Sequence, residues 1–421
     1  MRPVTVGASL LVAAAIMGAH ISAATAEPSE IQFTSSAAVR LPGSRVSPEE
    51  GEFGHSVALS SDGNTALVGA PEENGRVGAV WVFTRSGATW TQQGAQLRGT
   101  GESGAGSFGS SVALSANGNV ALIGGRSDNT SPKEPCCGAG AVWVFIRTGS
   151  TWTQQGAKLT SGPGSGKAEF GSSVALSADG RTALIGAPGI KNVGAAWVLT
   201  RAGSTWRHQA AKLTGRGAAT YAGFGNNVAL SSDGKTALVG GEGGSTGAAW
   251  VFTRSRSTWT QQGAKLTGGG NSRSTRFGDA VALSGNGTTA LIGAGGEDAE
   301  QGAAWVFTRA GTIWRRREKL TGGGEGPLAN FGESLALSFN GKVAVIGAAM
   351  DDEGSLERVG AAWIFTRSGS TWAQRGAKFR GGAGRGENGR FGASVALSAD
   401  SKTAIIGEDG DNAAWVFESE P

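Results

Sequence analysis

The chain has few of the residues that most often cross-link a fold. Its 421 residues include only two cysteines, Cys136 and Cys137, and these are adjacent. They cannot join distant segments as the disulfide frameworks of small secreted domains do. Three states of the pair stay open: a strained vicinal disulfide, a bond to another chain, or two loop thiols. The stability of the fold must therefore come from packing and closure.

Long hydrophobic runs and a strong charge balance are also missing. The apolar run at 10–19 is too short to cross a bilayer. It follows Arg2 and precedes the small residues Ala24-Thr-Ala26, a pattern typical of a secretory signal peptide. We predict that residues 1–26 are this signal, that the protein is secreted, and that nothing inserts into a membrane. Removing Arg2 lowers the formal net charge from +4 to +3, which argues against a nucleic-acid partner.

Glycine, by contrast, is abundant, and its 73 residues recur at fixed offsets, which indicates turns rather than disorder. Seven copies of one unit each open with Phe-Gly, at spacings of 55, 62, 54, 53, 54 and 60 residues. The opening residues are Phe53, Phe108, Phe170, Phe224, Phe277, Phe331 and Phe391. A period of this size indicates stacked supersecondary units rather than separate domains.

Each unit reads as four antiparallel strands joined by tight turns. In the third copy we predict strands at 172–177, 182–185, 195–200 and 205–213, with Asp179-Gly180 as a hairpin turn. No segment has the period or length of a helix. Six tryptophan pairs, nine residues apart, recur in register on the third and fourth strands, so we interpret them as core rather than as sugar platforms.

Loop lengths indicate which face carries function. The first-second and third-fourth turns are short and constant, whereas the second-third loops vary. Variable loops on a rigid scaffold are where binding residues concentrate. We therefore expect a binding face formed by the loops at 72–76, 126–135, 297–301 and 351–358. The lysines and arginines that repeat on the outer strands and turns are read as edge protection and solvated turn residues.

The seventh copy lacks its fourth strand, because the chain has only Glu-Ser-Glu-Pro after Phe417. Before the first copy stands Ala38-Val-Arg-Leu41, which resembles the fourth strands of the other copies. We predict that residues 31–41 supply the missing outer strand. The fold class is then all-β: one closed seven-bladed β-propeller of four-stranded antiparallel blades over residues 27–421.

The Phe-Gly openings and the endings Gly69-Ala-Pro71 and Gly186-Ala-Pro188 resemble the FG-GAP repeat. The resemblance covers about residues 30 to 421, and it implies the seven-bladed propeller of integrin alpha subunits and of many secreted bacterial proteins. The sequence is more similar to the bacterial branch. Integrin-type repeats often carry a calcium loop of alternating Asp and Asn between strands one and two. Here that place supplies one side chain per copy, such as Asp62 or Asn117, too few for a cation that needs six to eight oxygen ligands.

Signs of catalysis are sparse. His20 leaves with the predicted signal, while His55 and His208 occupy different repeat positions, and no zinc spacing or nucleophile motif appears. The residue after Phe-Gly does break the repeat, and it should face the axis of the ring. Asp279 and Glu333 hold this place in adjacent copies; if their carboxylates approach, one pKa rises and an acid/base pair results. The competing interpretation is a hydrated polar channel.

We therefore expect a binding or adhesion propeller for an extracellular protein or glycan, acting as a monomer and without a cofactor. Weak calcium binding by acidic loops remains an alternative to the absence of a cofactor. The candidate ligand-binding residues are Glu72, Glu73, Arg126, Asp279, Glu333, Asp351 and Asp352. Two other classes stay open: a polysaccharide lyase or hydrolase with its site at the channel mouth, and a structural module of a surface or matrix.

Overall fold

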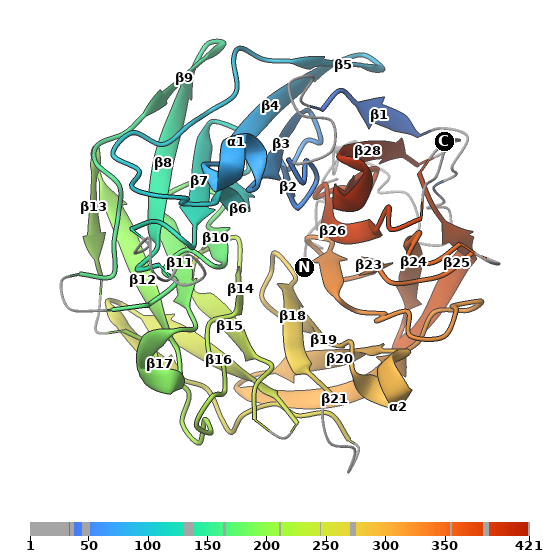
Figure 1. Ribbon diagram of the computed structural model, residues 1–421. Helices are drawn as coiled ribbons and strands as arrows, with labels where there is room; N and C mark the ends of the chain where they lie inside the picture. The colour runs from blue at the N-terminus through green and yellow to red at the C-terminus, as the bar shows by residue number, and fades with distance from the viewer. Residues whose placement is uncertain are drawn as a thin grey trace, which may run out of the picture.

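The computed structural model describes residues 33, 38–43, 51–129, 138–162, 166–209, 212–244, 246–269, 275–353, 356–381 and 387–419. The predicted signal peptide, Cys136 and Cys137 lie outside the described residues. Within this part, the chain forms seven four-stranded antiparallel sheets, arranged as the blades of a propeller around one axis (Figure 1). The predicted fold class is therefore confirmed.

The two inner strands of each blade are joined by the predicted hairpin turn. In blade 1 the Ser60 hydroxyl donates to Asp62 at 2.5 Å and the Asn64 backbone N–H donates to the same carboxylate oxygen at 3.0 Å. The innermost strands are β2 Ser56–Leu59, β6 Phe108–Leu114, β10 Val174–Leu176, β14 Asn227–Leu230, β18 Phe277–Leu283, β22 Ser334–Leu337 and β26 Phe391–Leu397. The second strands, buried throughout, are β3 Thr65–Ala70, β7 Val120–Gly125, β11 Thr182–Ala187, β15 Thr236–Gly241, β19 Thr289–Ala294, β23 Val343–Ala348 and β27 Thr403–Glu408.

The two outer strands carry the paired tryptophans. The third strands are β4 Ala79–Ser86, β8 Ala141–Thr148, β12 Ala195–Ala202, β16 Ala248–Ser255, β20 Ala303–Ala310, β24 Ala361–Ser368 and β28 Ala413–Glu418. The outer strands are β5 Thr89–Gln92, β9 Thr151–Gln154, β13 Thr205–His208, β17 Thr258–Gln261, β21 Ile313–Leu320, β25 Thr371–Phe379 and β1 Val39–Leu41.

The predicted outer strand at 205–213 is too long. β13 ends at His208, and the pairing resumes only as an isolated bridge between Leu213 and Ala196. Two backbone hydrogen bonds of 3.1 and 2.7 Å hold this bridge, so Leu213 still reaches its pairing position and is buried. The sequence pattern thus predicts the buried position of Leu213 but not the break in backbone pairing between His208 and Leu213.

The core lies between neighbouring blades and is built from the repeated aromatics. The Phe-Gly phenylalanine packs edge-on against the tryptophan of the third strand: Phe53 lies 5.3 Å from Trp81 between ring centroids, at 81°. This is the arrangement that aromatic quadrupoles favour. Trp143, Trp250 and Trp363 are among the largest fully buried side chains. The tryptophans therefore fill the core, as the sequence predicts.

The glycine of Phe-Gly is required by close packing at each blade junction. Gly54 has φ +105°, a region that side-chain-bearing residues rarely adopt, and a Cβ there would lie 2.1 Å from the carbonyl oxygen of Ala413. A serine on the neighbouring blade uses the same approach, since Ser394 Oγ donates to the Gly54 carbonyl at 2.7 Å. Only glycine lets the two backbones meet this closely.

An N-terminal strand closes the ring, as the sequence predicts, but β1 covers only Val39–Leu41 of the predicted range 31–41. Residues 31, 32 and 34–37 of that range lie outside the described residues. β1 pairs antiparallel with β28, with Val39 opposite Val416, Arg40 opposite Trp415 and Leu41 opposite Ala414. In Figure 1 the blue strand β1 lies along the red strand β28, next to the end of the chain. The backbone N–H of Ala399 in blade 7 also donates to the Ser61 carbonyl in blade 1 at 3.0 Å, as Ser61 does to Ala116 of blade 2.

The strand order places the variable loops on one face, which we call the long-loop face, and the short turns on the other, the short-turn face. Single helical turns interrupt four second-third loops: α1 Glu73–Arg76, η3 Ile190–Asn192, α2 Glu297–Glu300 and η4 Asp409–Asp411. Among the described residues, no helix is long and apolar enough to cross a membrane.

Candidate functional site

Three repeat positions meet around the axis on the long-loop face, and we call them together the inner rim. The residues before Phe-Gly are Glu52, Ser107, Glu169, Gly223, Arg276, Asn330 and Arg390. The residues after Phe-Gly are His55, Ser110, Ser172, Asn226, Asp279, Glu333 and Ala393. The residues after the second strand are Pro71, Arg126, Pro188, Glu242, Gly295, Ala349 and Asp409.

A tight turn around Phe-Gly holds the first two positions together. The backbone N–H of His55 donates to the Glu52 carbonyl at 3.0 Å, and Asp279 donates to Arg276 at the same distance. The residue before Phe is left-handed, with φ 51° at Glu52 and 52° at Arg276. Each blade thus holds two side chains at the rim in a fixed relation, whichever residues occupy the positions.

The most tightly connected rim residues lie at the seam between blades 1 and 7. Nδ1 of His55 lies 3.2 Å from a Glu52 carboxylate oxygen and 3.3 Å from an oxygen of Asp409, which is almost wholly buried. Burial opposes the charge on the imidazole, but the hydrogen bonds to Asp409 and Glu52 raise the pKa of His55 to about 9. His55 is therefore a cation at neutral pH.

Glu52, His55 and Asp409 place their ligand atoms within 4.8 Å of one another. One imidazole and two carboxylates are donors that a divalent cation accepts. Yet a metal must displace the proton of His55, and Arg390 adds a second positive charge 3.5 Å from Asp409. At neutral pH, ion pairs with His55 and Arg390 therefore already occupy the carboxylates that a metal would need.

A pocket of about 490 Å³ opens beside this cluster and spans the seam. Its wall includes Glu52, Arg390 and Asp409 from the rim, and Glu72 and Arg76 from the first long loop. Arg76 Nε lies 3.1 Å from a Glu72 oxygen, and both side chains are partly exposed. The pocket therefore offers charges of both signs, within the size range of roughly 300–1,000 Å³ that is usual for ligand sites.

A second group of rim residues gathers carboxylates from blades 4, 5 and 6. Burial raises the pKa of Asp279 to about 7, helped by Glu242 and then Glu333, and opposed by Arg276. The carboxyl groups of Asp279 and Glu242 share a hydrogen bond, and Glu242 also accepts from Asn226 at 3.1 Å. Burial also raises the pKa of Glu333. The pKa values of Asp279 and Glu333 are therefore raised mainly by burial, and at Asp279 the contribution of Glu242 is larger than that of Glu333.

Arg126 completes the rim on the side of blade 2. Its backbone N–H donates to the Ser110 hydroxyl at 3.3 Å, which joins two rim positions of one blade. The pKa of Glu52 lies below its ordinary value because of the hydrogen bond with His55, with further contributions from Arg390 and Arg126. The structure thus brings Arg126, Asp279 and Glu333 to the rim, and Glu72 to the adjoining pocket.

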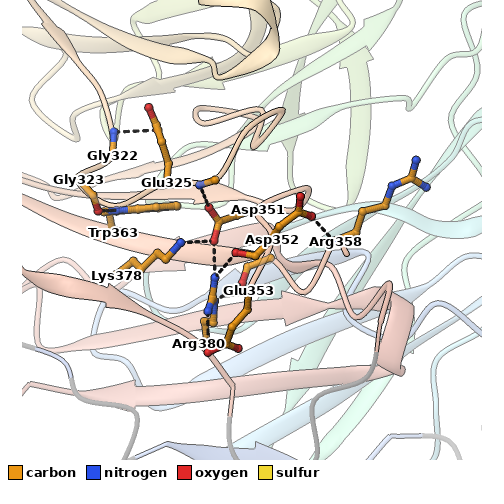
Figure 2. A network of polar contacts seen from close by, with 12 residues as sticks. Gly322, Gly323, Glu325, Asp351, Asp352, Glu353, Arg358, Trp363, Lys378 and Arg380 are labelled. Atoms are coloured by element: carbon orange, nitrogen blue, oxygen red, sulfur yellow. Dashed lines mark hydrogen bonds and ion pairs between the residues drawn. The ribbon is translucent and has the colours of Figure 1, made fainter. Parts of the chain in front are cut away.

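The other three candidate residues lie in the long loops, two of them buried. Glu73 is buried in α1. Asp351 is also buried, and its oxygens accept from Gly326 N–H at 2.7 Å and Lys378 Nζ at 2.6 Å, with Arg380 as a further partner (Figure 2). Asp352 accepts the Arg358 backbone N–H at 2.8 Å. In this geometry, Asp351 holds the loop together from inside, whereas Asp352 is partly exposed.

The outer-strand lysines have partners that the sequence reading did not assign. Lys158 pairs with Asp128 at 2.5 Å, Lys319 with Glu297 at 3.2 Å, and Lys378 with Asp351. In each case the acid lies three residues after the second strand of the same blade. The lysines therefore connect the outer strand to the long loop of their own blade, in addition to any protection of the sheet edge.

Sequence reasoning missed Glu52, Glu242, Arg390 and Asp409. A signal for them exists, because the positions before Phe-Gly and after the second strand vary in charge while their neighbours repeat. The position after Phe-Gly gave Asp279 and Glu333, and the long loops gave Arg126, but the charge variation at the other rim positions was not read. Of the long loop at 126–135, residues 130–135 lie outside the described residues, as do residues 354 and 355 of the loop at 351–358.

The fold and its inner rim define a seven-bladed β-propeller with one irregular face. The FG-GAP repeat model matches this chain at residues 152–199 and 259–307. Each match runs from the outer strand of one blade through the third strand of the next blade. The protein thus carries FG-GAP repeats within its propeller.

Comparison with solved structures supports the fold alone. Hydrazine synthase of Kuenenia stuttgartiensis superimposes with a TM-score of 0.57 at 13% sequence identity. The match covers 90% of this chain and 98% of that chain. Comparison with functionally curated proteins gave no match.

Proposed function

We propose that the protein is a secreted binding propeller that recognises an extracellular protein or glycan at the inner rim and seam pocket of its long-loop face. The observation that carries this proposal is the difference between the two faces. The short-turn face repeats one hairpin, whose Asp or Asn is engaged by a serine and a backbone N–H in every blade. The rim holds a different set of side chains in each blade.

The charges of the rim favour a ligand that carries both donors and acceptors. At the seam, protonated His55 lies beside Glu52 and Asp409, and Arg390 lies beside Asp409. Arg126 and Arg276 add cations at the rim in blades 2 and 5. A surface of one sign would favour a polyelectrolyte, whereas mixed charges at fixed spacing favour orientation and specificity. Peptide and glycan surfaces offer polar groups of both kinds.

The experiment is a combined glycan and matrix-protein array probed with residues 27–421. A binding role predicts at least one ligand, and binding that weakens when Arg76 and Arg126 are both replaced by alanine. Lys235→Ala is the matched control, because Lys235 is an exposed cation in a short turn on the opposite face. An array without ligand, or binding insensitive to the double variant, contradicts the proposal and leaves the structural-module alternative.

One observation favours a second candidate, a polysaccharide lyase or hydrolase at the channel mouth. A carboxyl group with a pKa of about 7, hydrogen-bonded to a second carboxyl, is suited to donate or accept a proton near neutral pH. Product release from a panel of polysaccharides tests this candidate. Release that survives Asp279→Asn, or no release from any polymer, contradicts it.

A further inference from the structure

We infer that the junction of blades 5 and 6 on the short-turn face holds an oxyanion-binding pocket, which takes a sulfate or phosphate group. The pocket has a volume of about 390 Å³. Arg309, Arg317 and Arg367 line it together with the hydroxyl side chains of Thr289 and Thr308. Among the described residues that line this pocket, none is acidic. It lies on the opposite face from the proposed ligand site and does not depend on it.

The pocket arises where blade 5 departs from the repeat. In blades 1 to 4 the residue three positions after the outer tryptophan is a glutamine, whereas blades 5 and 6 have an arginine there, Arg317 and Arg375. In three junctions a glutamine at this position accepts the indole N–H of the next blade: Gln93 from Trp152 at 3.0 Å, Gln209 from Trp259 at 3.2 Å and Gln262 from Trp314 at 2.9 Å. A guanidinium has no acceptor, so Arg317 cannot take this place.

Two residues that line the pocket have a buried donor without an acceptor among the described residues, a state that Trp90 Nε1 and Trp206 Nε1 share at other junctions. Trp372 lines the pocket and is 5% exposed, and its buried Nε1 has no hydrogen-bond partner among the described residues. The buried Nε of Arg367 also has none there. Arg367 Nη1 donates to the Thr289 hydroxyl at 3.5 Å, a longer contact than those of the equivalent Arg147 and Arg309 with Thr65 and Thr236, at 3.2 and 3.3 Å. Arg317 Nε donates to the Thr308 hydroxyl at 2.6 Å. Buried donors of this kind carry a cost unless an acceptor is supplied.

Another junction of the propeller shows which group pairs with the arginine at this repeat position. At the junction of blades 7 and 1, Arg85 occupies the position of Arg367, and it forms an ion pair with Glu418 of the preceding blade. Glu418 lies opposite Thr403 in β28, as Thr308 lies opposite Thr289 in β20. A carboxylate of the chain thus fills at the seam the place that a threonine leaves open at the junction of blades 5 and 6.

Among the described residues that line the pocket, the charged groups are the three arginines. Burial lowers the pKa of both Arg367 and the equivalent Arg147, but Asp62 opposes this shift at Arg147, and no carboxylate contributes at Arg367. The turn residue that matches Asp62 is neutral Asn286 in blade 5. Glu318, next to Arg317, accepts the Trp372 backbone N–H at 3.1 Å and is not part of the pocket lining. Guanidinium groups are suited to bind sulfate and phosphate oxygens.

The test is isothermal titration with three probes: inorganic sulfate, inorganic phosphate and a heparin octasaccharide. Arg317→Gln restores the residue of blades 1 to 4 and an acceptor for Trp372, so we expect this variant to fold. We expect the wild type to bind at least one probe and Arg317→Gln to bind it about tenfold or more weakly. Tight binding of heparin alone identifies a sulfated glycan as the source of the oxyanion, and binding of phosphate over sulfate identifies a phosphorylated ligand.

Arg315→Thr is the control, because it removes the same charge from an exposed β21 residue outside the pocket and restores the threonine of blade 1. It should leave the affinity unchanged. The indole N–H signal of Trp372, assigned with Trp372→Phe, should shift when the probe binds. Absence of binding of all three probes, an equal loss in Arg315→Thr, or a Trp372 signal that does not move overturns the inference. Variants of the inner rim leave this pocket intact, so the two proposals fail separately.

Discussion

Nδ1 of His55 in blade 1 lies 3.3 Å from a carboxylate oxygen of Asp409 in blade 7, although 354 positions separate them in the chain. The contact crosses the seam where the two ends of the propeller meet. It also forms one wall of the rim beside the seam pocket. Ring closure and the candidate ligand site are therefore coupled, because any loosening of the seam moves His55 relative to Asp409.

The first prediction concerns the closing strand. Leu41 is 1% exposed and packs between the last and first blades, so Leu41→Ala should lower the free energy of unfolding by about 2–5 kcal/mol. Val39→Ala, at a 39% exposed position of the same strand, should change it by less than about 1 kcal/mol. Chemical denaturation measures both. A chain without residues 27–41 that melts no earlier than the chain of residues 27–421 would refute closure by β1.

The second prediction is the pH dependence of the seam. The folded pKa of His55, about 9, lies above its ordinary value of 6.5, so folding takes up a proton between these values. The stabilisation is fully present below about pH 6.5 and is lost as the pH rises through 9. His55→Gln should therefore be less stable than the wild type at pH 6, and the difference should shrink at pH 9.5. A difference that stays constant between these pH values contradicts the ion pairs.

The third prediction concerns Asp279, whose raised pKa lowers the stability of the fold at neutral pH, whereas that of His55 increases it. The pKa of Asp279 rises from 3.8 to about 7 on folding, so its ionisation costs stability as the pH rises through this range. Asp279→Asn cannot ionise, and it should gain stability over the wild type at pH 8 while matching it near pH 4. Asp233→Asn is the control. Burial opposes the charge of Asp233, but hydrogen bonds from Ser231 and Lys235 N–H lower its pKa, so this variant should lose stability at pH 8.

The fourth prediction compares the contributions of Asp351 and Asp352 to the stability of their loop. Removing one partner of a buried ion pair leaves the other charge uncompensated, so Asp351→Ala should cost about 3–5 kcal/mol. Asp352→Ala removes one hydrogen bond to a backbone N–H and should cost about 1 kcal/mol. Denaturation curves of both variants decide the point. A stable Asp351→Ala protein would show that the network in Figure 2 does not support the loop.

The fold could be predicted from the sequence because each blade repeats the same local rules. Phe-Gly spacing, turn residues and paired tryptophans each specify one blade, and the unpaired end of the seventh copy indicates the closing strand. The inner rim could be predicted only in part. Asp279 departs visibly from its repeat position, whereas Glu242 lies 37 residues earlier in a loop, and only the ring brings the two together.

Asp351 shows the opposite difficulty. In sequence it is one of three consecutive acids in a variable loop, which is typical of solvated or ligand-binding charge. Its burial depends on Lys378 and Arg380, which arrive from the end of β25 at a distance of 27 and 29 positions. Charge in a loop alone does not reveal whether a cation of the same blade already engages it.

The central claim is that ligand recognition takes place on the long-loop face, and one titration tests it most directly. The tightest ligand from the glycan and matrix-protein array is titrated into the wild type, the Arg76→Ala/Arg126→Ala variant and Lys235→Ala. We predict about a tenfold or greater loss of affinity in the rim variant and unchanged affinity in Lys235→Ala. Equal affinities in all three proteins, or a loss confined to Lys235→Ala, would contradict the account.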